Sequence, residues 1–339
     1  MLFRSLRSPK YVEWSLEIQR QFGARNVLSV RYAGNHGYDL FLFNRDANAS
    51  ASLALYPNGF AGLPGVAPDP RFQVVSQLTN HGSSNYNGLI AMFRRAFSHG
   101  FQGQVSYTWS HSLDTLSNGG LTFFSYDSLP GQINPYDVRS LNYSNADYDV
   151  RHQLTADFIW EIPVTFKNKL MKTIFAGWSA ASKLNAHTGT PFSVTNYPLG
   201  VALSSFGGAV LADVRDPGVN TSCGHSAIDT PCFSAGQFAN TAAQTDFGNW
   251  PRNSFRGPGF FNLDSSLYKT MPFGERMRFT LGASAFNVLN HPSFADPNSD
   301  VSSGGLGLIQ FTAASPSSPY GYDGGPSGRA LVVTGRFTF

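Results

Sequence analysis

Residues 12–19, VEWSLEIQ, alternate between apolar and polar side chains without interruption. Successive side chains of a β-strand point to opposite faces, so an extended chain here carries one apolar face and one polar face. The apolar set is Val12, Trp14, Leu16 and Ile18, and the polar set is Glu13, Ser15, Glu17 and Gln19. The stretch therefore predicts a β-strand.

The same alternation returns along the whole chain and predicts about nine strands. They lie at residues 12–19, 28–32, 86–97, 101–109, 153–162, 178–189, 262–267, 276–285 and 331–339. Two of them, 86–97 and 178–189, alternate less cleanly than the others. Most are roughly 9–12 residues long, which suits a tilted strand that crosses a bilayer.

The connections between these strands alternate strictly between short and long. The short ones lie near 23–25, 98–100, 163–177 and 272–275, and the long ones at 34–85, 110–147, 190–259 and 291–327. Bacterial outer-membrane barrels have short periplasmic turns and long extracellular loops. We therefore expect an all-β protein, an antiparallel transmembrane β-barrel, whose Gly-, Ser- and Pro-rich loops have no regular structure beyond short turns.

A soluble β-sandwich is the alternative, because the same apolar residues would then face a second sheet. In a barrel, the outward aromatic side chains would instead form girdles at the two membrane interfaces. These are Trp14, Tyr32, Tyr107, Trp109, Trp160 and Phe279.

Composition excludes several other classes of protein. The 339 residues include 29 phenylalanines but only 13% charged residues, which excludes a disordered chain. The net charge is +3, with Lys and Arg scattered along the chain, so we expect no nucleic-acid partner. There is also no apolar run of about 18 residues, the length that a transmembrane helix needs.

Several phrases, taken in their order along the chain, resemble the barrel of TonB-dependent outer-membrane receptors. The similarity is strongest to the Oar-like branch, whose members often carry a carboxypeptidase-regulatory-like domain. The phrases are YNGLIAMFRRAF at 86–97, VSYTWS at 105–110, NADYDVRH at 145–152, TGTPF at 188–192, NLDSSL at 262–267 and AFNVLN at 285–290. Residues 336–339, RFTF, resemble the closing strand of such barrels, with Phe337 and Phe339 on the apolar face.

This resemblance implies a location in the outer membrane of a Gram-negative bacterium. Receptors of this kind have about 22 strands around a plug domain. Residues 1–339 are therefore expected to be the C-terminal part of the barrel domain, a fragment of about nine strands without the plug. The partners implied are outer-membrane lipid, the barrel-assembly machinery and, through a plug domain, the TonB system.

The function implied is TonB-coupled uptake of a bulky nutrient such as an iron chelate, a vitamin or an oligosaccharide. One alternative is a surface or adhesion barrel that transports nothing. Another is a soluble extracellular β-sandwich that binds carbohydrate. Polar residues on the lumen side of the strands are candidates to line a substrate path: Arg31, Gln104, Asp157, Arg278 and Arg336.

Cys223 and Cys232 are the two cysteines of the chain, and His225 lies between them in a long loop. In an oxidising compartment they predict a disulfide. Two free thiols, or a metal site completed by His225, are the alternatives.

Enzyme signatures are weak. Asp147, Asp149 and Arg151 share one face, which predicts a solvated charge network, and His152 lies on the opposite, apolar face. Residues 304–307, GGLG, lack the Lys and Ser/Thr of a phosphate-binding loop, and no nucleophile elbow occurs between a strand and a helix. We expect no catalytic residue, no cofactor and no metal.

Overall fold

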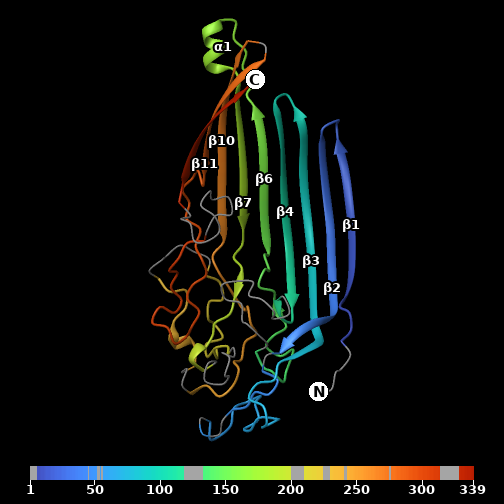
Figure 1. The fold of residues 1–339 in the computed structure, drawn as a ribbon, viewed down its shortest axis with the longest axis vertical. Coiled ribbons are helices and arrows are strands. Elements are labelled where there is room, and N and C mark those ends of the chain that lie inside the picture. Colours follow the sequence, from blue (N-terminus) through green and yellow to red (C-terminus); the bar gives the residue numbers. More distant parts are fainter. Residues whose placement is uncertain are drawn as a thin grey trace.

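The computed structural model describes residues 6–44, 46–51, 54, 56–117, 133–199, 210–223, 230–239, 243–274, 276–313 and 328–339. Nine long strands form one antiparallel sheet in the order of the chain (Figure 1). They are β1 (Lys10–Phe22), β2 (Asn26–Asn44), β3 (Gln77–Ser98), β4 (Phe101–Asp114), β6 (His152–Glu161), β7 (Trp178–His187), β10 (Phe260–Phe273), β11 (Met277–Phe286) and β12 (Ala330–Thr338). Each strand predicted from the alternation is present.

The remaining elements are short. Strand β5 (Ser144–Asn145) pairs with the end of β4, and β8 (Pro191–Phe192) pairs with β9 (Phe255–Arg256) in a separate two-stranded sheet. Helix α1 (Lys169–Phe175) joins β6 to β7, and a 3₁₀ turn, η2, spans Ala235–Gln237. Among the described residues, no helix is both long enough and apolar enough to span a bilayer.

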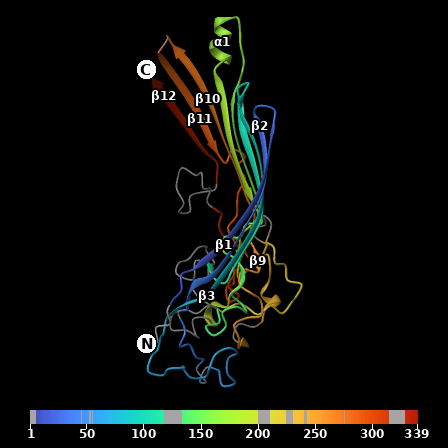
Figure 2. The same ribbon diagram turned by 90° about the vertical axis from the view of Figure 1, so that its right-hand side faces the viewer.

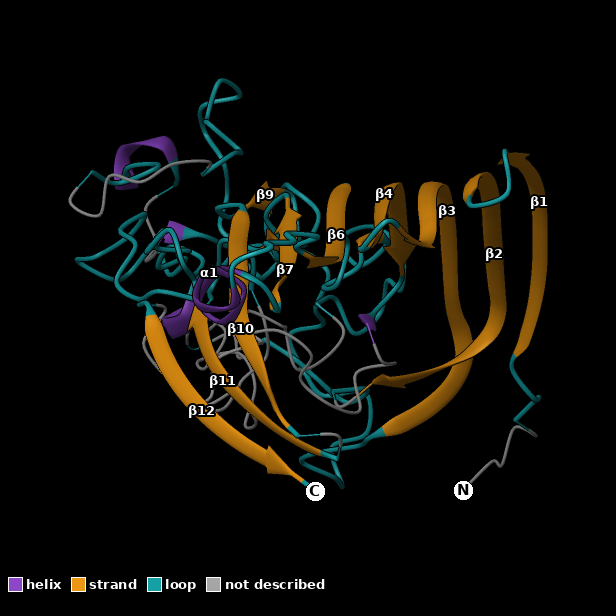
Figure 3. Cartoon of the chain, turned by 90° about the horizontal axis from the view of Figure 1, so that it is seen from above, coloured by secondary structure: helices purple, strands orange, loops and turns teal. Residues whose placement is uncertain are grey.

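Seen from above, the long strands follow an open arc with β1 and β12 at its two ends (Figure 3). Within the described residues, β1 pairs only with β2, and β12 pairs only with β11. The sheet is therefore the curved wall of a barrel that these strands alone do not close. The alternative of a soluble sandwich is wrong, because the nine strands lie in one sheet and not in two facing ones.

The register of the strands keeps apolar side chains on one face of the sheet from end to end. Leu16 lies opposite Tyr32, Tyr32 opposite Leu89, and Leu89 opposite Trp109. The next row begins with Glu17 opposite Arg31. Directly paired residues project to the same face, so each face continues from strand to strand. Exceptions are few, such as Ile90 opposite Arg31 on the polar face. All six aromatic residues expected on the outside lie on the apolar face: Trp14, Tyr32, Tyr107, Trp109, Trp160 and Phe279.

Several polar atoms on the apolar face are paired with one another. The Tyr107 hydroxyl lies 2.8 Å from His152 Nδ1, and the hydroxyls of Ser182 and Ser265 lie 2.8 Å apart. Pairing of this kind suits a surface against lipid, where an unsatisfied polar group costs several kcal/mol. The placement of His152 on this face agrees with the alternation of its strand.

Short turns gather at one end of the strands, and long connections gather at the other (Figures 1 and 2). Gly23, Gly100 and Gly274 have positive φ angles of 62°, 77° and 69° in three of the short turns. Such angles favour glycine because it has no Cβ. The fourth short connection, between β6 and β7, contains helix α1, which the sequence alternation did not predict.

Strands β2 and β3 extend farther than expected. The connection predicted at 34–85 is wrong at both ends, since β2 continues to Asn44 and β3 begins at Gln77. Polar pairs hold the added length together: His36 Nδ1 lies 2.9 Å from Asn85 Oδ1, and these residues are register partners. A strand with polar residues on both faces has no apolar/polar alternation, so this pattern does not predict it.

The buried apolar core lies among the long connections. A first loop core consists of Phe192, Val194, Ala212, Val214, Val219, Phe233, Phe238, Phe255 and Leu306. A second consists of Ala51, Phe60, Ile133, Leu199, Val210, Leu211 and Phe247. Regular structure in the described long connections is limited to short pieces such as β5, β8, β9 and η2, close to the expectation of short turns. What the alternation did not predict is the packing of their phenylalanines, which excludes water.

Candidate functional site

The polar face of the sheet carries a row of charges across its centre. Register partners place Arg94 beside Gln104, Gln104 beside Asp157, Asp157 beside Lys183, and Lys183 beside Asp264. Opposite charges in neighbouring cross-strand positions stabilise a sheet. The row therefore makes a polar wall across strands β3, β4, β6, β7 and β10.

The five residues predicted to face the lumen all lie on this polar face. Gln104 and Asp157 are direct partners. Arg31 lies apart from them on β2, opposite Glu17. Arg278 lies opposite Thr338, and Arg336 opposite Thr280, at the other side of the sheet. Their common role in lining a substrate path stays a prediction.

Arg252 lies at the loop end of the sheet with only 2% of its side chain exposed. It pairs with the carboxylate of Asp114, and its Nη1 lies 3.0 Å from Asp147 Oδ1. Its Nε donates a hydrogen bond of 2.8 Å to the carbonyl of Asn142. A single guanidinium thus joins the end of β4, the 142–147 segment and the 252–256 segment, with its charge compensated on two sides.

A second ionic cluster lies beside the first. Arg151 Nε donates to Asp149 Oδ2 at 2.9 Å, and Arg256 pairs with the same carboxylate. The side chain of Asp149 is fully buried, and its Oδ1 accepts a 2.6 Å hydrogen bond from the backbone N–H of Ser112. Asp147 bonds to Arg252 rather than to Arg151. The predicted solvated network is therefore wrong, because loop residues bring two further arginines over both aspartates.

Sequence patterns did not reveal Arg252 or Arg256. Both lie in an irregular segment without periodicity, and their partners are more than a hundred positions away in the chain. The available signal was indirect. Two aspartates and one arginine in the 145–152 phrase leave one negative charge that a cation from another part of the chain must balance.

A cavity of about 640 Å³ opens where the polar face of β1–β4 meets the loops. Its lining combines aromatic and amide or hydroxyl groups from different strands. Tyr11, Asn35, Tyr86, Ser112 and Tyr148 contribute to it, and Asp114 of the first ionic cluster lies at its edge. Convergent polar groups between aromatic surfaces can both hydrogen-bond a bulky polar ligand and cover its apolar parts.

Asp213 and Asp246 lie close together in the loop assembly. Burial, followed by repulsion from the Asp246 carboxylate and their shared hydrogen bond, raises the pKa of Asp213 to about 6. Arg215 acts in the opposite direction. This carboxyl is therefore partly protonated in mildly acidic solution.

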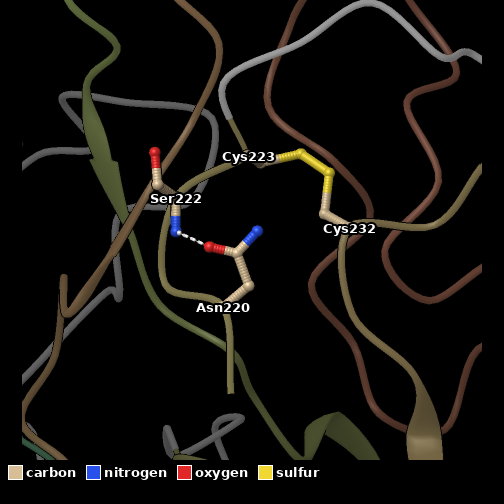
Figure 4. Close-up of a disulfide and its surroundings, with 4 residues drawn as sticks. All are labelled: Asn220, Ser222, Cys223 and Cys232. Atoms are coloured by element: carbon tan, nitrogen blue, oxygen red, sulfur yellow. Dashed lines mark hydrogen bonds between the residues drawn. A yellow bond between two sulfur atoms is a disulfide. The ribbon is translucent and has the colours of Figure 1, made fainter. Parts of the chain in front are cut away.

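A disulfide joins Cys223 and Cys232, whose Cα atoms lie 5.4 Å apart (Figure 4). Cys223 is buried and Cys232 packs against the first loop core. Beside it, the backbone N–H of Ser222 donates to Asn220 Oδ1 at 3.1 Å. The alternative of a metal site needed His225, which lies outside the described residues.

The predicted closing strand corresponds to β12. Phe337 lies opposite Phe279 on the apolar face, and the Phe337 and Phe339 rings are 6.5 Å apart. Phe339 lies just beyond the end of the strand and is almost fully exposed. In the described part of the chain, no group of three or more His, Cys, Asp or Glu side chains is placed to hold a metal ion.

Comparisons with solved structures and with protein families each found a match. One matching solved structure is the outer membrane transporter YddB from Escherichia coli, with 12% sequence identity and a TM-score of 0.45. The match covers 98% of this chain and 33% of that one, so this chain spans about a third of the transporter's length. No curated protein matches. The outer membrane beta barrel domain family matches residues 2–322, so this chain belongs to that family and lies in the outer membrane.

Proposed function

We propose that these residues form the C-terminal wall of a TonB-dependent receptor that takes up a bulky nutrient. The observation that carries the proposal is the continuity of the polar face. It runs from the charged row around Asp157 to the loop-side cavity, and beside that row the opposite face carries apolar residues such as Val105 and Ala156. Such a wall can guide a polar ligand across lipid without exposing it to hydrocarbon.

The loop assembly supports a role in ligand capture. Two apolar cores, the disulfide and the Arg252 cluster hold the described loops in one arrangement. A preformed binding surface loses less conformational entropy when it binds a ligand. We propose that the cavity near Tyr86 is part of the first contact for the ligand.

Coupling to TonB requires parts outside these strands. In the proposed receptor, further strands complete the barrel and a plug domain blocks it until energy is supplied. The ligand is an iron chelate, a vitamin or an oligosaccharide. The mixture of tyrosine rings and amides around the cavity suits any of these.

Uptake by cells tests the proposal. Cells carrying the complete protein are given labelled ferric chelates, cobalamin and oligosaccharides, with TonB present or deleted. We expect accumulation of one probe class that stops without TonB. Tyr86→Ala should weaken binding of that probe, whereas Tyr107→Ala, on the apolar face, should not.

A surface barrel that transports nothing is the second candidate, since a rigid loop assembly also suits adhesion. This candidate predicts that whole cells bind the labelled probes equally with and without TonB. Failure of every probe to accumulate, together with unchanged binding after TonB deletion, would favour this candidate.

A further inference from the structure

Helix α1 presents an apolar surface that the described part of the chain leaves largely exposed, although the Phe166 ring contacts Phe175. Leu170, Met171, Ile174 and Phe175 are 46–67% exposed. They fall on one side of the helix, because residues four apart share a face. Lys172 and Thr173 lie on the other side.

Contacts with the sheet place this helix at the apolar face. Lys269 belongs to the apolar row by register, opposite Trp178 and Leu281. Its ammonium donates to the carbonyl of Ile174 at 3.1 Å and also to that of Ala176. Trp178 Nε1 donates to the Ile174 carbonyl at 3.0 Å. The C-terminal end of α1 is therefore fixed to residues of the face that meets lipid.

Lys269 is otherwise difficult to explain. A lysine on the lipid face of a barrel strand is strongly destabilising at the bilayer midplane and much less so near the interfaces. Here the ammonium is buried, lies 5.4 Å from the centre of the Trp178 ring and caps a helix C-terminus, where a cation is favoured.

The position of α1 identifies what covers it. The helix joins β6 to β7 at the short-turn end of the strands, in the middle of the sheet (Figure 1). Strands added at β1 or β12 would lie several strands away. The helix is attached to Lys269 and Trp178 of the apolar face, and that face contacts the membrane.

We propose that α1 is an interfacial anchor that inserts into the phospholipid of the periplasmic leaflet, with Lys269 fixing its orientation. Amphipathic helices of this type bury their apolar side about 5–10 Å into the boundary between headgroups and acyl chains. This inference rests on the outer-membrane location and does not depend on the transport function.

Depth measurements test the anchor. Ile174→Cys and Lys172→Cys are each labelled with an environment-sensitive fluorophore in the complete protein, whose barrel is closed, folded into phosphatidylethanolamine and phosphatidylglycerol vesicles. We expect the label at 174 to emit at shorter wavelength, to be quenched by nitroxide lipids and to resist aqueous iodide. The label at 172 should show the reverse pattern. Heat-modifiable migration selects samples that are folded.

Two results would overturn the proposal. If both labels are quenched by iodide, the helix lies off the membrane. If the label at 174 is shielded from iodide and from lipid quenchers alike, another protein surface covers it. In addition, Lys269→Met should open the 174 label to iodide, whereas Lys269→Arg should not; equal behaviour of the two variants contradicts the role of Lys269.

Discussion

Arg252 donates hydrogen bonds to two other segments, the end of β4 and residues 142–147, from a position that solvent scarcely reaches. Arg252→Met leaves Asp114 and Asp147 buried without their counterion. Breaking a buried pair in this way costs about 3–5 kcal/mol. We expect the loop assembly to lose about that much stability, measured by hydrogen exchange of peptides from residues 142–147 and 252–256.

Arg71 supplies the matched control. It pairs with Asp69 at 2.6 Å, but its side chain is 78% exposed. Exposed pairs contribute about 0–1 kcal/mol. Arg71→Met should therefore change loop stability little; equal losses from both substitutions would contradict the structural role of Arg252.

The Asp213 carboxyl makes the loop assembly sensitive to pH. Its pKa in the folded protein, about 6, lies above the ordinary value of 3.8. A raised carboxyl pKa means that folding favours the protonated form, so ionisation destabilises the loops above pH 6. We expect loop stability to rise as the pH falls from about 7.5 through 6 toward the ordinary carboxyl pKa.

Hydrogen exchange at about pH 5 and about pH 7.5, corrected for intrinsic rates, measures this effect. Asp213→Asn should stabilise the 210–223 segment at the higher pH and remove the difference. Asp137→Asn is the control, because backbone N–H donors of Arg139 and Ser140 lower the pKa of Asp137. A pH dependence that survives in Asp213→Asn would refute the assignment.

Substitutions on the two faces of strand β4 test which face contacts lipid. Val105 lies on the apolar face, opposite Phe93 and Ala156, and its neighbour Ser106 lies on the polar face. Arginine on the lipid face costs about 2–4 kcal/mol near the midplane. Val105→Arg should therefore lower the free energy of unfolding in a denaturant titration, and Ser106→Arg should be tolerated.

Elements with a strong period of two were predictable from the sequence. The strand around Leu16 and the strand around Phe158 each have apolar residues at every second position, because one face meets lipid. The loop-side ends of β2 and β3 were missed, since Asn35 and His36 put polar groups on both faces. Helix α1 was missed because seven residues are too few for a helical period to emerge.

The candidate site was predictable only where it lies on strands. Alternation placed Gln104 and Asp157 on the polar face, since face follows directly from strand position. Neither their pairing nor the Arg252 cluster was predictable, because cross-strand register and loop packing bring together residues far apart in the chain. The loop phenylalanines, such as Phe192 and Phe255, indicate a packed core. They lie in segments without alternation, so the alternation pattern did not predict this core.

The open edges of β1 and β12 have consequences for the whole molecule. An unpaired backbone group in lipid costs several kcal/mol, so a stable barrel must pair both edges. We expect these 339 residues alone not to form a heat-modifiable monomer in detergent, in electrophoresis without boiling. Such a monomer would show that the nine strands close on themselves.

The central claim is that the sheet is a membrane wall with one face toward lipid. A scan of single spin labels along β6, from His152 to Glu161, in protein in the outer membrane tests it most directly. We predict that access to oxygen dissolved in lipid alternates with period two, with maxima at Leu154, Ala156, Phe158 and Trp160. Access to a water-soluble nickel reagent should be lower at these positions than at their neighbours. Uniform access along the strand, or maxima for oxygen at Thr155 and Asp157, would contradict the account.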